Sequence, residues 1–194
     1  MDERDKIKHF ASKDKLEQYL IQGKGIEEFK KQEKSLFLGE FRERVIKALS
    51  IPQLHEEGTY PEIEEAIKDP RAKKLVINRK ADLKKAAEYI RLAKEYNLQF
   101  TTVDSENIQD QIGLVVASDQ GIDVDNIYVK ERSEKLRELG LPQGVIDNPK
   151  GKLCKKCYDE VKRLAPEELK NYRPLSFFDR ILGEKCIGCK KDNG

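Results

Sequence analysis

Four cysteines, the only ones in this chain of 194 residues, are arranged as two Cys-x-x-Cys pairs near the C-terminus. Cys154 and Cys157 form the first pair, in KLCKKCYDEVKRL, and Cys186 and Cys189 form the second, in EKCIGCKK. Two thiolates three residues apart in a tight turn can bind one metal ion from the same side. Two such pairs supply four sulfurs, the donor set that Zn²⁺ prefers in tetrahedral structural sites. The spacing therefore predicts one structural zinc ion bound by all four cysteines.

Two other chemistries also use cysteines in this pattern. Four thiolates can hold an iron–sulfur cluster, and a single Cys-x-x-Cys pair can act as a thioredoxin-type redox site. The redox site requires a strand–helix–strand context, and the sequence around neither pair indicates one. A closed site with four cysteine ligands leaves no coordination position for a substrate, so we do not expect zinc catalysis.

Basic residues surround both cysteine pairs. Residues 150–194 contain 12 basic and 7 acidic side chains, a net charge of +5, whereas the whole chain carries only +2. One interpretation is that these lysines compensate the net charge of −2 that four thiolates and Zn²⁺ carry together. The other is a surface that binds RNA, the ribosome or another protein. The lysines concerned are Lys155, Lys156, Lys185, Lys190 and Lys191.

The 28 residues between the two pairs are expected to hold helices, in YDEVKRLAPEELKNY and in SFFDRILG. A tail of this size has too few apolar residues to fold alone, and a bound metal would supply the missing free energy. Aromatic residues at 158, 172, 177 and 178 could serve a partner-binding surface or the core of the tail. We expect a small core beside the metal, made of Leu164, Leu175, Phe177, Phe178, Ile181 and Leu182.

Outside the cysteines, the candidates for chemistry are few. Arg42 and Arg44, in FRERV, either pair with neighbouring glutamates on a helical face or bind an anion. Asp119 follows an apolar run and is a candidate for a ligand pocket. The two histidines lie near no residue that would make a catalytic pair, and the sequence contains no glycine-rich phosphate loop.

The main part of the chain alternates helical and strand patterns. Apolar residues recur at helical spacing from Leu38 to Leu49, and helices are also expected over 62–68, 81–97 and 131–139. In the second of these, positions 83, 86, 87, 90 and 93 are expected to face inward. Short apolar runs predict strands at 75–77, 100–103, IGLVVAS and NIYVK, the first of them central and buried. This order predicts an α/β fold with helices packed on a mixed sheet.

Several stretches of this region resemble the YueI-like family of bacterial proteins: SLFLGEFRERVIKALS, KKLVIN, QFTTVD, IGLVVASD and NIYV. The similarity covers residues from about 13 to 130, and its most specific part runs from Phe37 to Val45. The resemblance implies a compact α/β domain with a mixed sheet, in a family without an established activity. Asp119 matches an aspartate of the family pattern. The cysteine-bearing tail lies outside the similarity.

Together these features predict three parts: a charged segment with a short amphipathic helix (1–34), an α/β domain (35–139) and a tail that binds metal through four cysteines in a module like a zinc ribbon (145–194). The sequence has no apolar run of membrane-spanning length and no secretory signal, so we expect a cytosolic protein that does not bind membranes. It favours a non-catalytic binding protein. The alternatives are an α/β domain that binds or transforms a small anion, and a redox or iron–sulfur module.

Overall fold

The computed structural model describes residues 25–104 and 111–189. The amphipathic turn expected around Leu16–Ile21 lies outside these residues. Among the described helices, none combines the length and the apolar character that crossing a lipid bilayer requires.

The chain folds into two compact units, and each unit is made of two separate segments of the sequence. The first unit comprises Met1–His55 and Ile63–Val129, and the second comprises Glu56–Glu62 and Lys130–Gly194. The second unit is therefore larger than the expected tail, because it also contains residues 130–144 and a segment from early in the chain.

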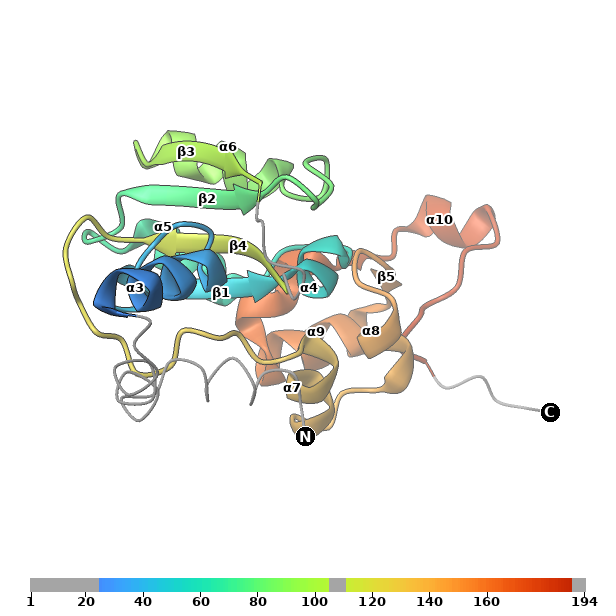
Figure 1. The fold of residues 1–194 in the computed structure, drawn as a ribbon. Helices are drawn as coiled ribbons and strands as arrows, with labels where there is room; N and C mark the ends of the chain where they lie inside the picture. Colours follow the sequence, from blue (N-terminus) through green and yellow to red (C-terminus); the bar gives the residue numbers. More distant parts are fainter. Residues whose placement is uncertain (1–24, 105–110, 190–194) are drawn as a thin grey trace. The chain divides into compact units, whose positions relative to one another are not determined.

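The first unit is built on a four-stranded mixed sheet with the strand order β1-β4-β2-β3 (Figure 1). Strands β2 and β3 are parallel, and β4 runs antiparallel to its two neighbours, β1 and β2. This confirms the expected mixed α/β architecture. The elements of the unit, with the start of α5 shared with the second unit, are α3 (Gly25–Leu36), η1 (Arg42–Arg44), β1 (Val45–Ser50), α4 (Ile51–His55), α5 (Pro61–Lys68), β2 (Lys74–Asn78), α6 (Ala87–Glu95), β3 (Gln99–Val103) and β4 (Ile112–Ala117).

The two central strands form the interior of the first unit. All six residues of β4 are buried, as are four of the five in β2, because helices cover the sheet and both faces exclude water. Helix α4 packs on β1 and β4, and α6 packs on β2 and β3. The continuous apolar runs in these strands were therefore sufficient to predict them.

The predicted helix through Leu38–Leu49 is wrong. Only η1 is helical there, and Val45–Ser50 forms strand β1, paired antiparallel with β4. Val45 and Leu49 are fully buried. A short apolar run satisfies helical and strand spacing equally well, and here pairing with β4 decides the outcome. The strand expected at NIYVK is reduced to one bridge between Ala48 and Tyr128.

The predicted helix over 81–97 is shorter than expected. Helix α6 begins only at Ala87, because the residues before it form turns. Ala87 and Leu83, which were expected to face inward, are exposed, whereas Ala86 and Ala93 are buried as expected. Asn97 ends the helix at φ 59°, the left-handed conformation that asparagine tolerates.

The second unit contains little regular structure. Its only strand pair among the described residues, β5 with β6, is parallel and two residues long. An apolar cluster of Leu136, Val145, Leu153, Val161 and their neighbours forms its core. Its elements are α7 (Arg132–Glu138), α8 (Gln143–Asp147), β5 (Lys152–Leu153), α9 (Lys155–Leu164), η2 (Pro166–Asn171), β6 (Arg173–Pro174) and α10 (Phe177–Ile181).

The core expected for this unit is wrong in its main part. Phe177, Phe178, Ile181 and Leu182 are all strongly exposed. Only Leu164 of the expected set packs against the cluster. The observed core consists instead mainly of side chains from α7, α8 and α9, which the sequence did not assign to it.

Candidate metal centre

The first cysteine pair is positioned by the start of helix α9. Cys154 is the residue before the helix and Cys157 lies in its first turn. This places both sulfurs at the helix N-terminus, where the helix dipole favours thiolates. The second pair lies in a turn after α10, and the backbone N–H of Ile187 donates to the carbonyl of Lys152 at 3.2 Å. That hydrogen bond holds the turn beside β5.

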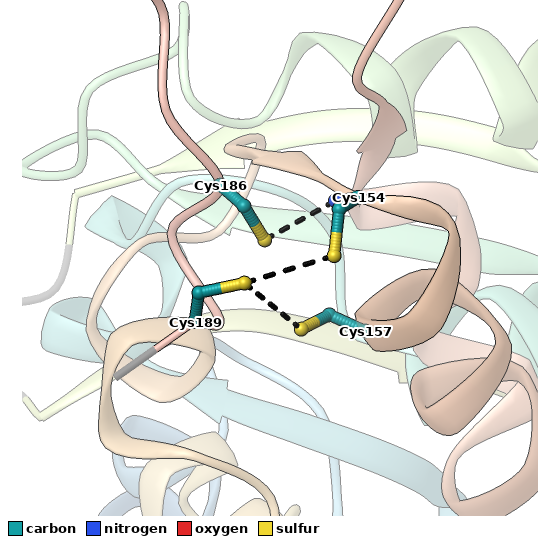
Figure 2. Close-up of side chains that lie close together, drawn as sticks. All are labelled: Cys154, Cys157, Cys186 and Cys189. Atoms are coloured by element: carbon teal, nitrogen blue, oxygen red, sulfur yellow. Dashed lines mark hydrogen bonds between the residues drawn. The ribbon is translucent and has the colours of Figure 1, made fainter. Parts of the chain in front are cut away.

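The four sulfur atoms converge, although the two pairs are separated by 28 residues (Figure 2). All four Sγ atoms lie within 4.8 Å of one another. The sulfur of Cys189 is 3.7 Å from that of Cys154 and 3.9 Å from that of Cys157. Sulfurs around a tetrahedral ion with Zn–S bonds of about 2.3 Å are separated by about 3.8 Å. The cluster therefore has the size that a single metal ion requires.

The cysteines are free thiols and not disulfides. A disulfide joins its sulfurs at about 2.05 Å, well below the separations here. Cys157 is buried, Cys154 and Cys186 are half-buried, and Cys189 is exposed. The cysteine cluster thus lies at the surface of the second unit, with the side chain of Cys189 facing solvent.

Backbone amides around Cys186 favour its thiolate. The N–H of Cys154 donates to the sulfur of Cys186 at 3.1 Å. Partial burial acts to raise the pKa of Cys186, but this N–H and that of Gly188 outweigh it and lower the pKa to about 7. Burial instead raises the pKa of Cys157 above its ordinary value. A positively charged ion among the sulfurs would stabilise all four thiolates.

Two glycines allow the second pair to approach the first. A Cβ at Gly188 would lie 3.1 Å from both the Cβ and the sulfur of Cys157. A Cβ at Gly144, in α8, would lie 1.9 Å from the carbonyl oxygen of Ile187. The sequence predicted that Gly188 is needed for backbone freedom. A glycine is needed there because Cys157 packs closely against it, and its φ is not unusual. Gly144 was missed because its contact lies 43 positions away in the chain.

The lysines beside the cysteines are exposed where the structure describes them. Lys155 and Lys156 lie in the first turn of α9, and Lys185 precedes the second pair. Lys190 and Lys191 lie outside the described residues. The role of these lysines in binding a partner stays a prediction.

The other candidates from the sequence, Arg42, Arg44 and Asp119, all lie in the first unit. Arg42 donates to the carbonyls of Val124 at 2.6 Å and Asp125 at 3.2 Å, so it fixes the loop after β4. Arg44 lies over the ring of Phe41, with its guanidinium carbon 5.5 Å from the ring centroid. Asp119 is exposed at the end of β4. Nη1 of Arg42 and Nε of Arg44 are buried without a hydrogen-bond partner among the described residues, so anion binding by these two residues stays a prediction.

A buried charged cluster in the second unit was missed by sequence reasoning. The side chain of Arg132 is 1% exposed and lies 3.3 Å from the carboxylate of Glu168, which is equally buried. It also donates to the carbonyls of Glu57 at 2.6 Å and Thr59 at 2.8 Å. Desolvation raises the pKa of Glu168, although the nearby arginine acts to lower it. Arg132 thereby holds the Glu56–Glu62 segment within the second unit.

Comparison with known proteins distinguishes the main part of the chain from the part that carries the cysteines. Residues 13–128 match the family described as "Protein of unknown function (DUF1694)". The chain belongs to this family. It is 34% identical to the uncharacterized protein YueI of Bacillus subtilis (strain 168) over 121 residues, which are 62% of this chain and 92% of YueI.

The same relative has a solved structure that resembles this fold. The crystal structure of the YueI protein from Bacillus subtilis matches with a TM-score of 0.51 at 34% identity, covering 61% of this chain and 93% of that one. The resemblance to the YueI-like family drawn from the sequence is thus confirmed. All four cysteines follow the matched residues, so the family does not account for the cysteine cluster.

Proposed function

We propose that this YueI-like protein is a non-catalytic cytosolic binding protein whose four cysteines hold one structural Zn²⁺ ion. The observation that carries the proposal is the convergence of four free thiols at 3.7–3.9 Å separations. Cys154, Cys157, Cys186 and Cys189 are the ligands. The ion joins the start of α9 to the end of the chain and stabilises a unit with a small apolar core.

Zinc accounts for the geometry better than the alternatives. A [4Fe–4S] cluster places several iron and sulfide atoms between the thiolates, so it requires wider spacing than a single ion does. A redox pair uses only two sulfurs, whereas here all four lie within 4.8 Å of one another, the arrangement that one ion with four ligands requires. Four protein ligands complete the tetrahedron, which leaves no position for a substrate and makes the centre structural.

The binding role rests on the charge of the C-terminal part of the second unit, residues 150–194. Residues 150–194 carry +5, and Lys155 and Lys156 are exposed at the start of α9. This surface suits an anionic partner: RNA, the ribosome or an acidic protein. An RNA partner would be released steeply by added salt, since each neutralised phosphate contributes counterion release. Binding assays on Lys155→Ala/Lys156→Ala, against Lys84→Ala/Lys85→Ala in the first unit as control, test this surface.

Elemental analysis of protein purified without added metal tests the zinc centre. We expect one zinc per chain and a colourless protein, and Co²⁺ substituted for zinc should show the intense visible bands of a tetrahedral thiolate site. Cys186→Ser should lose the metal. Iron with visible absorption, or a metal-free protein with four titratable thiols, would contradict the proposal.

A further inference from the structure

Helix α10 exposes a group of apolar side chains next to the cysteine centre. Phe177, Phe178, Ile181 and Leu182 are 73%, 74%, 66% and 78% exposed, the highest values among the large apolar residues described. Their positions, i, i+1, i+4 and i+5, lie on one side of the helix. We call these four residues the α10 face.

The polar side of α10 is tied to its own unit. Ser176 and Asp179 form a capping box at the helix start. Lys152, in β5, bonds Asp179 at 2.7 Å and Glu184 at 2.8 Å. The hydrogen bond from Lys152, together with those from Ser176, lowers the pKa of Asp179 to about 2, so the ion pair persists at neutral pH. These contacts hold α10 with its apolar face toward solvent.

The exposed apolar area is large for a small unit. Large apolar side chains offer about 150–250 Å² each, so four at these exposures present on the order of 500 Å². Monomeric proteins seldom expose more than about 300–600 Å² in one patch unless it is a binding site. The two phenylalanine rings already pack edge to face, with centroids 6.1 Å apart. The two rings therefore fix each other's position, and the α10 face can pack against a partner.

A recess opens beside this face in the same unit. Its walls include Pro142 and Gly144 of the α8 region, Leu175, Ile187 and the sulfur-bearing residues Cys154 and Cys186. Its volume is about 1180 Å³. Pockets for small ligands measure about 300–1,000 Å³ and enclose most of the ligand. This recess is wider and open, which suits a protruding protein element.

We propose that the α10 face binds a second copy of this chain, with α10 of each copy packed into the recess of the other. One unit carries both the protruding apolar face and an apolar recess, as a two-fold interface requires. Two faces together bury on the order of 1,000 Å² from these side chains alone, the lower bound of a specific interface. Aromatic residues are enriched at the centres of such interfaces.

The charges at the rim agree with a two-fold partner. Arg180 and Glu184 both border the recess. A two-fold axis near α10 brings the arginine of one copy toward the glutamate of the other, so opposite charges meet. Lys152 already bonds Glu184, so Arg180 is the charge at this rim that gains a new partner in the dimer.

In this dimer the metal centre only anchors the chain on the C-terminal side of α10, through Cys186 and Cys189. Metal content is therefore measured in every sample. Sedimentation velocity of the full zinc-loaded chain, over a wide range of protein concentration, should show a monomer–dimer equilibrium. Phe178→Asp/Leu182→Asp should weaken dimerisation by about 30-fold or more, since charged groups replace buried anchors. Its metal content should equal that of the unmodified protein.

A control introduces one aspartate at an exposed apolar residue outside the α10 face. Leu83→Asp, at a position 44% exposed in the first unit, should leave the dimer unchanged. A photoreactive residue at position 178 should crosslink to the recess of another copy, between residues 142 and 188. A metal-loaded protein that stays monomeric would overturn the proposal, as would a dimer that survives Phe178→Asp/Leu182→Asp. Monomers that instead sediment with anionic vesicles through α10 would assign the face to a membrane.

Discussion

The two units of this protein are stabilised by different interactions. In the first, a four-stranded sheet buries all six residues of β4 between helices, and one cluster unites apolar residues of β1, β2, β4 and the end of α3. In the second, the strands are two residues long, the interior includes a buried arginine–glutamate pair, and four cysteines gather at the surface. The first unit is a family fold, whereas the cysteine cluster lies outside the family match.

This difference shows how a small unit can be stable with little sheet. The fraction of surface that folding buries grows with the length of the chain. A small unit therefore buries little apolar area with which to stabilise its fold. Charged hydrogen bonds supply part of the remainder, and the proposed structural metal would supply the rest; both join groups that are distant in sequence. The first unit should therefore fold without metal and the second should not.

The largest expected effect comes from removing a sulfur ligand. Cys157→Ser should leave the second unit unfolded and the first folded, because structural zinc contributes about 10–16 kcal/mol in zinc-finger peptides and small domains have only about 5–15 kcal/mol in total. In amide NMR spectra, signals of α9 should collapse to random-coil positions while those of β4 persist. Tyr158→Phe, one position along α9, is the control and should keep both sets. A Cys157→Ser protein with native α9 signals would show that the apolar core suffices.

The next effect concerns the buried charge. Arg132→Met removes the partner of Glu168 and the donor to Glu57 and Thr59, and should lower the free energy of unfolding of the second unit by about 3–5 kcal/mol. Urea denaturation followed by hydrogen exchange measures it. Arg137→Met, exposed in the same helix, should change it by less than about 0.5 kcal/mol. Equal effects from both substitutions would contradict the assigned role of Arg132.

The smallest effect tests the close packing behind the second cysteine pair. Gly144→Ala places a methyl group against the carbonyl of Ile187 and should cost about 1–3 kcal/mol while weakening metal retention. Competition with a chromophoric chelator measures the retention. Gly121→Ala, where the nearest atom would lie at an ordinary 3.5 Å, is the control in the first unit. If both alanine variants retain metal equally, the contact between α8 and the cysteine turn does not contribute to metal retention.

The sequence predicted what depends on local spacing. The cysteine pairs indicated a four-sulfur cluster because the ligands of each pair are three residues apart, and β2 and β4 were predicted from unbroken apolar runs. Strand β1 was missed because its apolar residues fit a helix equally well, and only pairing with β4 distinguishes the two. The α10 face was assigned to the core because composition records that a residue is apolar, not whether anything covers it. Arg132 meets Glu57 and Thr59 across more than 70 positions, which no local pattern encodes.

We propose that a bound metal stabilises the fold of the second unit and that the first unit folds without it. Hydrogen–deuterium exchange on one preparation of the full chain, before and after removal of metal by a chelator, tests it most directly. We expect amides of α9 to lose their protection on chelation while those of β2 and β4 keep theirs, and we expect added Zn²⁺ to restore the original pattern. Unchanged protection of α9 after complete metal removal would contradict it.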